Sequence, residues 1–359
     1  MGSWDCFCAL CGARLSSCVQ FKSRPTQTAE QDNNDDGQDS GASGNDPFST
    51  ETHAYDPDVL AEKDVEWLST CRLLGKLVED DFNKAFITRR GYYGDHGSFG
   101  IFGDRAERQS EELDPNDPGF YSHACYQETI HETVGYPFHE KCWEIISKLV
   151  LGYKSINEID KAAMYSAMED FTLSDRSLQL SYGLMHGQSQ YWNCYPGEEA
   201  TVCDPGLNIL TSGDIMSALP TGPPKYLTLS EKIVQDPFSQ LPFDVIHIIL
   251  AKLLGPSRLK LLTASHHVYQ QSCSDSFWKW MMRTDIVPWC PELHSLLNDP
   301  EFVSPRVDLK RAYLYMKYAT NARANRPGPF MGLANRRRII AACKPLAELY
   351  QDILEQDSD

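Results

Sequence analysis

The positions of apolar residues between 241 and 254 predict a short amphipathic helix. They recur in steps of three and one, which places them along one stripe of an α-helix. Pro242 suits the first turn, because its missing N–H would have no partner there. Gly255 and Pro256 should end the helix. The stripe consists of Pro242, Val245, Ile246, Ile249, Leu250 and Leu253.

Two more short helices are expected directly after this one. Ser257 can cap a helix over residues 258–269, and a third should follow near Ser276. Three short helices cannot bury this much apolar surface among themselves. Docking on a partner protein is one way to cover the apolar surface that remains exposed. The other interpretation is an ordinary core segment, because most amphipathic helices pack within their own fold. The apolar residues of the two later helices include Leu259, Leu262, Phe277 and Trp278.

The N-terminal half mixes helical and strand-like patterns. Residues 59–74 have helical spacing, whereas glycines punctuate the aromatic residues of 91–104, which favours short strands and turns. A helical stripe covers residues 142–150. Ser155 and Glu158 then form a capping box, which we expect to open another helix. These patterns predict an α+β fold that is mainly helical.

The C-terminal segment has its own packing face over residues 339–353. Pro345 should kink or split the helix that carries it, because proline removes a backbone hydrogen bond. Three arginines at 336–338 could engage nucleic acid, an import receptor or an acidic partner. We favour a helix face of solvated or intramolecularly paired arginines.

Composition narrows the possible functions. The chain has 359 residues, enough for two or three domains, and its net charge of −17 argues against a broad phosphate-binding surface. It shows neither a signal peptide nor a run of about 18 apolar residues, so we expect a soluble protein of the cytoplasm or nucleus. In a reducing compartment, its 12 cysteines should be thiols or metal ligands. No nucleophile beside a base and no phosphate-binding loop is recognisable, so we expect no catalytic residues.

Two pairs of residues have the spacing of zinc ligands. Cys8 and Cys11 enclose a tight turn that ends in glycine, and His139 and Cys142 lie at a predicted helix start. Together they would form a tetrahedral Cys3His site, a common structural zinc arrangement that resembles treble-clef modules.

Roughly 130 residues separate the two pairs, far more than compact zinc motifs contain. The alternative is therefore a free or redox-labile N-terminal pair, with His139 at a helix start and Cys142 as a buried thiol. Other residues could substitute as ligands: Cys6, Cys18, His123 and Cys125.

The signals over residues 237–282 resemble an F-box in their order. Leu-Pro comes first, Val-Ile, Ile-Leu and Leu follow, and Leu-x-x-Leu-x-x-Ser and Phe-Trp-Lys complete the series. His266 and Tyr269 stand where many F-boxes carry Arg and Trp. With the segments 8–12, 135–143 and 335–347, the chain resembles a family of fungal F-box proteins whose substrates are unassigned.

The resemblance implies a non-catalytic subunit of a Skp–cullin–F-box ubiquitin ligase. The F-box would bind a Skp-type adaptor and through it the cullin scaffold, while the flanking regions would hold an unknown protein target for ubiquitin-dependent degradation. The alternative is a non-catalytic zinc-binding structural or regulatory protein whose F-box-like helices are internal core. The implied adaptor-binding residues are Leu241, Pro242, Val245, Ile246, Ile249, Leu250, Leu253, Leu259, Leu262, Phe277 and Trp278.

The chain is accordingly expected to divide into five regions, with the main boundary in the stretch rich in Gly and Pro at 187–225. They are a Cys-rich segment (1–20), a disordered acidic linker (21–58), an α+β domain that is a candidate for target recognition (59–230), the F-box (236–285) and a helical C-terminal region (286–359).

Overall fold

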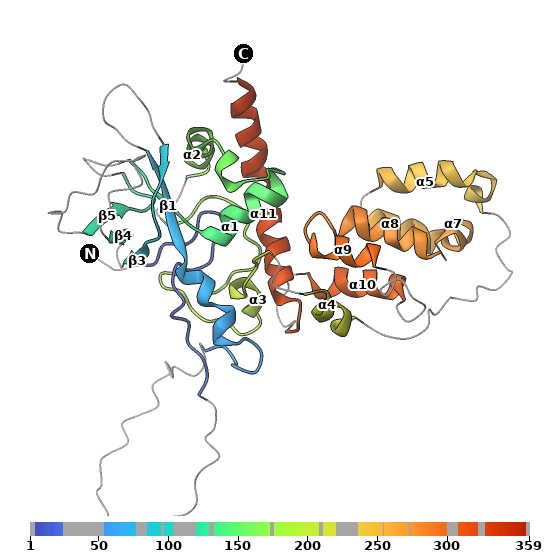
Figure 1. Cartoon of the computed structure of the whole chain (residues 1–359), viewed down its shortest axis with the longest axis horizontal. Coiled ribbons are helices and arrows are strands. Elements are labelled where there is room, and N and C mark those ends of the chain that lie inside the picture. Colours follow the sequence, from blue (N-terminus) through green and yellow to red (C-terminus); the bar gives the residue numbers. More distant parts are fainter. Residues whose placement is uncertain are drawn as a thin grey trace, which may run out of the picture. The chain divides into compact units, whose positions relative to one another are not determined.

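Figure 1 shows the computed structural model of the chain, which has a mixed α and β architecture. Helix accounts for about 49% and strand for about 13%, so the predicted mixed and mainly helical class is confirmed. The chain forms two compact units: unit 1 comprises residues 1–206 and 322–359, and unit 2 comprises residues 207–321. The structure describes residues 4–23, 54–76, 85–94, 97–102, 120–128, 133–172, 176–207, 211–219, 236–253, 255–272, 274–299, 308–321 and 327–356.

Unit 1 contains two three-stranded antiparallel sheets. The first has the order β2 (Ala85–Ile87), β1 (Cys71–Lys76), β6 (Tyr136–His139). The second has the order β3 (Tyr92–Gly94), β4 (Ser98–Phe102), β5 (Phe120–Ala124), so the expected strands within 91–104 are confirmed. The register of β1 and β6 places Cys71 directly opposite His139.

The helical spacing of residues 59–74 does not produce one helix. This stretch forms the 3-10 turns η2 (Glu62–Asp64) and η3 (Glu66–Ser69), and then strand β1. The prediction was wrong because the residues from 71 onward pair with β2 and β6 on both sides, and such tertiary pairing overrides local helical preference.

The remaining helices of unit 1 follow the first sheet. Helix α1 (Glu140–Ile145) runs into the π-helical turn η4 (Ile146–Val150). The capping box of Ser155 and Glu158 is present, but it opens only the 3-10 turn η5 (Ile156–Glu158). Helix α2 (Lys161–Asp170) has its own cap, Asp160, whose side chain accepts from the Ala163 N–H at 2.9 Å. A short helix, α3 (Glu199–Val202), comes later.

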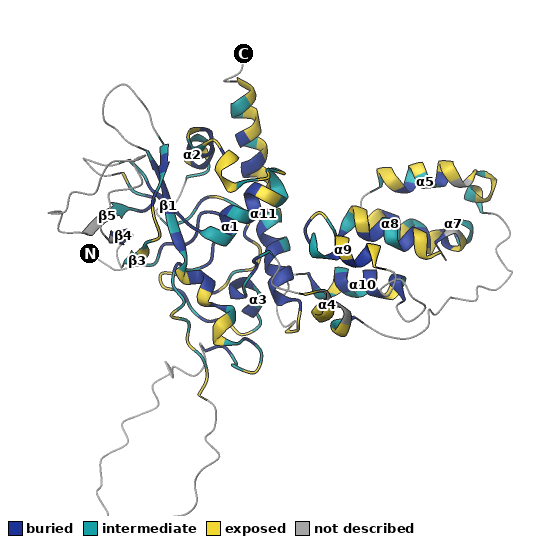
Figure 2. Ribbon diagram, in the orientation of Figure 1, coloured by how far each residue is buried: buried dark blue, intermediate teal, exposed yellow. Residues whose placement is uncertain are grey.

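The C-terminal helix α11 (Met331–Gln356) belongs to unit 1 and is not split at Pro345. Cys343 and Leu346 are buried on either side of this proline, so packing holds both halves of the helix on the same core. The first half of α11 is mostly dark blue in Figure 2, which marks buried residues. This places the last part of the expected 286–359 region with the N-terminal residues.

Unit 2 is helical throughout its described part. It begins with α4 (Ser212–Ala218) and η6 (Pro237–Gln240). The four helices α5 (Phe243–Lys252), α6 (Gly255–Ala264), α7 (His266–Gln271) and α8 (Asp275–Asp285) follow, and then α9 (Glu292–Asn298) and α10 (Leu309–Ala319).

The expected helix over 258–269 is in fact two helices. Gly255 and Pro256 do not only end α5 but also begin α6. The extended backbone of Ser265 then separates α6 from α7. The Ser265 hydroxyl accepts from the Val268 N–H at 3.1 Å and so caps α7.

The predicted linker, 21–58, lies largely outside the described residues. Its described ends meet, because Phe21 and Tyr55 form an isolated parallel bridge. Among the described residues, no helix has both the length and the apolar character to cross a membrane.

A buried arginine ties four helices of unit 2 together. The Arg258 guanidinium donates to the Leu250 carbonyl (2.6 Å) and pairs with the Asp285 carboxylate (2.5 Å), which also accepts from the Tyr313 hydroxyl (2.7 Å). These residues come from α6, α5, α8 and α10. Replacing Arg258 or Asp285 by an uncharged residue would leave the other charged group buried without its ion-pair partner.

We therefore expect Arg258→Met to lower the free energy of unfolding of the full chain by about 3 kcal/mol in urea titrations, since an uncompensated carboxylate would remain buried. Arg283→Met, at an exposed position of α8, should change it by less than about 0.5 kcal/mol. The double variant Arg258→Met/Asp285→Leu should recover part of the loss. Equal stability of Arg258→Met and wild type would contradict this role of the ion pair.

Candidate metal centre

A tight turn near the N-terminus carries Cys8 and Cys11. The Gly12 N–H donates to the Cys8 carbonyl and the Cys8 N–H to the Ala13 carbonyl, both at 2.8 Å. Gly12 has a φ of +71°, and a β-carbon there would come within 2.7 Å of the Tyr182 ring. Glycine is therefore required at this turn for both its backbone conformation and its size.

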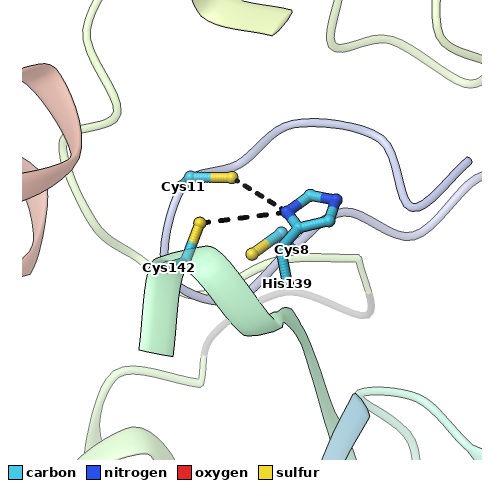
Figure 3. A group of neighbouring side chains, drawn as sticks. All are labelled: Cys8, Cys11, His139 and Cys142. Carbon is cyan, nitrogen blue, oxygen red and sulfur yellow. Dashed lines mark hydrogen bonds between the residues drawn. The ribbon is translucent and has the colours of Figure 1, made fainter. Parts of the chain in front are cut away.

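The second pair lies where strand β6 meets helix α1. His139 is the last residue of β6 and the N-cap of α1, and Cys142 follows in the first turn of that helix. The Ala9 N–H donates to the Pro137 carbonyl at 2.8 Å, which joins the N-terminal turn to β6. The strand-to-helix transition thus aims both side chains at the turn, as Figure 3 shows.

The four side chains form one fully buried group. Their ligand atoms all lie within 4.8 Å of one another. The His139 Nδ1 atom is 3.4 Å from the Cys11 Sγ atom and 3.9 Å from the Cys142 Sγ atom (Figure 3). A tetrahedral ion with bonds of about 2.0 Å to nitrogen and 2.3 Å to sulfur would separate such ligand atoms by about 3.6 Å. The group could therefore hold a metal ion with little rearrangement.

The second ring nitrogen of His139 fixes which atom faces the cysteines. His139 Nε2 lies 3.0 Å from the Arg14 carbonyl oxygen, which can only accept, so Nε2 carries the proton. The lone pair of the neutral ring is then on Nδ1, toward the sulfur atoms. Histidines that bind metals almost always donate their other N–H in this way.

The electrostatics of the group favour a bound cation. Burial would raise the pKa of Cys8, but hydrogen bonds with Cys11 and Cys142 and the charge of His139 hold that pKa well below its usual value. Burial and the neighbouring cysteines instead raise the pKa of the Cys142 thiol. Burial opposes charge on His139, yet the sulfur atoms of Cys8, Cys71 and Cys11 raise its pKa well above the ordinary range. A divalent cation would stabilise thiolates beside a neutral imidazole, so it would suit this buried group better than an imidazolium does.

Side chains of the C-terminal helix α11 hydrogen-bond to the backbone of the N-terminal turn. The Arg338 guanidinium donates to the Cys11 carbonyl at 2.7 Å and to the Tyr182 carbonyl at 2.9 Å. The Cys343 thiol donates to the Leu10 carbonyl at 3.2 Å. Arg336 and Arg338 are buried and hydrogen-bonded inside the molecule, so two of the three arginines at 336–338 have the intramolecularly paired form, one of the two that we expected.

The alternative ligands considered from the sequence do not join the group. Cys18 is exposed, and Cys6, His123 and Cys125 are not among the four clustered residues. Sequence reasoning missed Cys71, whose pKa is raised by burial and whose thiol donates to the Leu68 carbonyl at 3.1 Å. Cys71 lies close to His139 only because β1 pairs with β6, and no local sequence motif reveals that pairing.

The predicted adaptor-binding residues lie together in unit 2, but they do not share one exposed face. Ile248, which lies off the predicted apolar stripe, is 62% exposed. Ile246, Leu250, Leu262, Phe277 and Trp278 are buried; Leu241, Ile249, Leu253 and Leu259 are partly buried; Pro242 and Val245 are exposed.

Comparisons with known proteins give no relative: no family model, no curated protein and no solved structure matches the chain. The fold and the site define the chain as a mixed α/β protein with a buried Cys3His group in unit 1.

We expect the purified chain to carry about one equivalent of a divalent transition metal by elemental analysis, since four convergent protein ligands form a closed site. Cys11→Ser and His139→Ala should reduce this below about a tenth of an equivalent, because each removes a ligand. Cys18→Ser, an exposed cysteine of the same segment, is the matched control and should keep the metal. A folded wild-type chain without metal would refute the site.

Proposed function

We propose that this chain is the substrate receptor of a Skp–cullin–F-box ubiquitin ligase, in which α5–α8 bind a Skp-type adaptor and unit 1 holds a structural zinc ion. The observation that carries the first part is the two-sided character of α5. Ile246 and Leu250 pack inside unit 2, whereas Val245 and Ile248 are 39% and 62% exposed. Figure 2 marks exposed positions along this helix.

The exposed side of α5 is suited to a protein partner. Val245, Ile248 and Ile249 follow one another at steps of three and one, so they lie on neighbouring positions of one helix face. Aliphatic anchors on a short helix are typical of helix-in-groove recognition. Burying two such side chains contributes favourable free energy without any new polar contact. This arrangement supports adaptor binding by α5.

Zinc is the metal that the donor set fits best. Three cysteine sulfurs and one imidazole are soft to borderline ligands, which suit zinc better than calcium or magnesium. All four ligands come from the protein, so a tetrahedral ion would have no open position for water or substrate. We propose a structural ion, which agrees with a protein that performs no bond chemistry itself.

In this proposal the chain works by proximity. The adaptor connects unit 2 to the cullin scaffold, and unit 1 is the candidate surface for holding the target. A tethered target meets the activated ubiquitin at high effective concentration. Exposed apolar residues of unit 1 offer contacts for such a target: Leu184, Tyr191 and Tyr195.

A second candidate is a zinc-binding structural or regulatory protein without an adaptor. The burial of Phe277, Trp278 and Leu262 supports it, because these side chains already have partners inside unit 2. The two candidates differ in what the exposed side of α5 does. In the second candidate, Val245 and Ile248 would remain in solvent.

We expect the chain to form a 1:1 complex with a fungal Skp-type adaptor, and Val245→Asp/Ile248→Asp to weaken it at least about tenfold, because charges would replace apolar anchors. Both positions are exposed, so the variant should keep the wild-type circular dichroism spectrum and thermal midpoint. Ile156→Asp/Leu184→Asp, at exposed positions of unit 1, is the matched control and should bind normally. A folded wild-type chain that binds no adaptor would favour the second candidate.

Adaptor binding should not depend on the metal. The candidate metal ligands belong to unit 1 and α5 to unit 2, and each unit has its own buried residues. Cys11→Ser should therefore lose zinc and still bind the adaptor within about twofold of wild type in a calorimetric titration. Joint loss of zinc and adaptor would show that the two units do not fold independently.

A further inference from the structure

Unit 2 contains a pocket of about 370 Å³ between helices α6, α7, α8 and α10. Its walls are mainly apolar, with Leu259, Leu262, Trp278 and Leu314 among the lining residues. A volume above about 300 Å³ with mostly apolar walls and few polar groups is characteristic of sites for small molecules. Leu259, Leu262 and Trp278 are also among the predicted adaptor-binding residues, but neither the metal centre nor the exposed side of α5 lines this pocket.

One cation lines the pocket. The Lys310 ammonium lies 4.7 Å from the centre of the Tyr269 ring and 5.9 Å from that of Trp278, and all three residues line the cavity. Within the described part of the chain, Lys310 forms no ion pair with a carboxylate. The Lys310 charge is thus stabilised by cation–π contacts with two aromatic rings and by no acidic side chain among the described residues, although the chain has a net charge of −17.

We infer that this pocket binds a small monocarboxylate with an apolar body. The carboxylate would pair with the Lys310 ammonium, and the body would displace water from the leucine-lined wall. A cationic ligand would be repelled by Lys310. A neutral ligand of the same shape would bind more weakly, because it cannot form the ion pair. The inference does not depend on adaptor binding.

The test compares a carboxylic acid with its uncharged analogue on the full chain. Calorimetric titration with 4-phenylbutyrate should give at least about fivefold tighter binding than with 4-phenylbutanamide, which has the same apolar body. This comparison uses the wild-type protein, so it does not depend on the folding of any variant. Equal affinity for the two compounds, or no binding of either at millimolar concentrations, would overturn the inference.

Two variants locate the binding. Lys310→Met keeps an apolar stem over Tyr269 but removes the charge, so it should abolish the preference for the acid and leave the affinity for the amide unchanged. Thr263→Phe, at an exposed position of the pocket wall, should weaken both compounds by filling the cavity. Lys279→Met, on α8 and not among the lining residues, should bind as wild type does. A preference for the acid that survives Lys310→Met would place the carboxylate elsewhere and overturn the assignment.

Discussion

The structure of unit 1 depends on the meeting of two segments that are 128 residues apart, at Cys11 and His139. Three buried thiols can pack as small apolar groups, but their ionised forms are costly to bury unless a cation compensates the charge. A shared metal ion would do so and would also close a long loop, which is where a crosslink removes most entropy from the unfolded chain. The β6–α1 junction and the N-terminal turn thus bring together the four residues that could hold a metal ion.

The last helix of the chain belongs to unit 1, and its arginines bond the N-terminal turn and residues 205–206. Arg338 bonds the carbonyl of Cys11, and Arg336 donates to the Pro205 carbonyl at 2.8 Å and to the Gly206 carbonyl. These guanidinium groups donate to backbone carbonyl oxygens, and Arg338 also donates to the Asn335 side-chain oxygen, so both arginines are hydrogen-bonded although they are buried. A helix held in this way tolerates Pro345, because its packing compensates for the missing backbone hydrogen bond.

The sequence revealed the candidate metal ligands but not their surroundings. Cys-x-x-Cys before glycine and His-x-x-Cys at a helix start are local patterns that identified the four candidate ligands, but whether the two pairs meet was left open by the sequence and is answered by the fold. Cys71 and Arg338 were not, because strand pairing brings the first to the site and helix packing the second. Long-range strand pairing also explains why the helix predicted from residues 59–74 was wrong: β1 pairs on both sides, and this pairing overrides the local helical pattern.

The apolar periodicity of α5 does not show which of its apolar residues remain exposed. An apolar stripe identifies the positions that a helix buries, and Ile246 and Leu250 on that stripe are indeed buried within unit 2. A residue that meets a partner must instead remain exposed in the free protein, so it must lie outside the buried part of the stripe. Ile248 is 62% exposed and lies near the exposed Val245 on α5, and under the proposed function this side of the helix is where an adaptor would bind. In a short helix of this kind, the apolar residues that break the pattern carry more information about binding than those that make it.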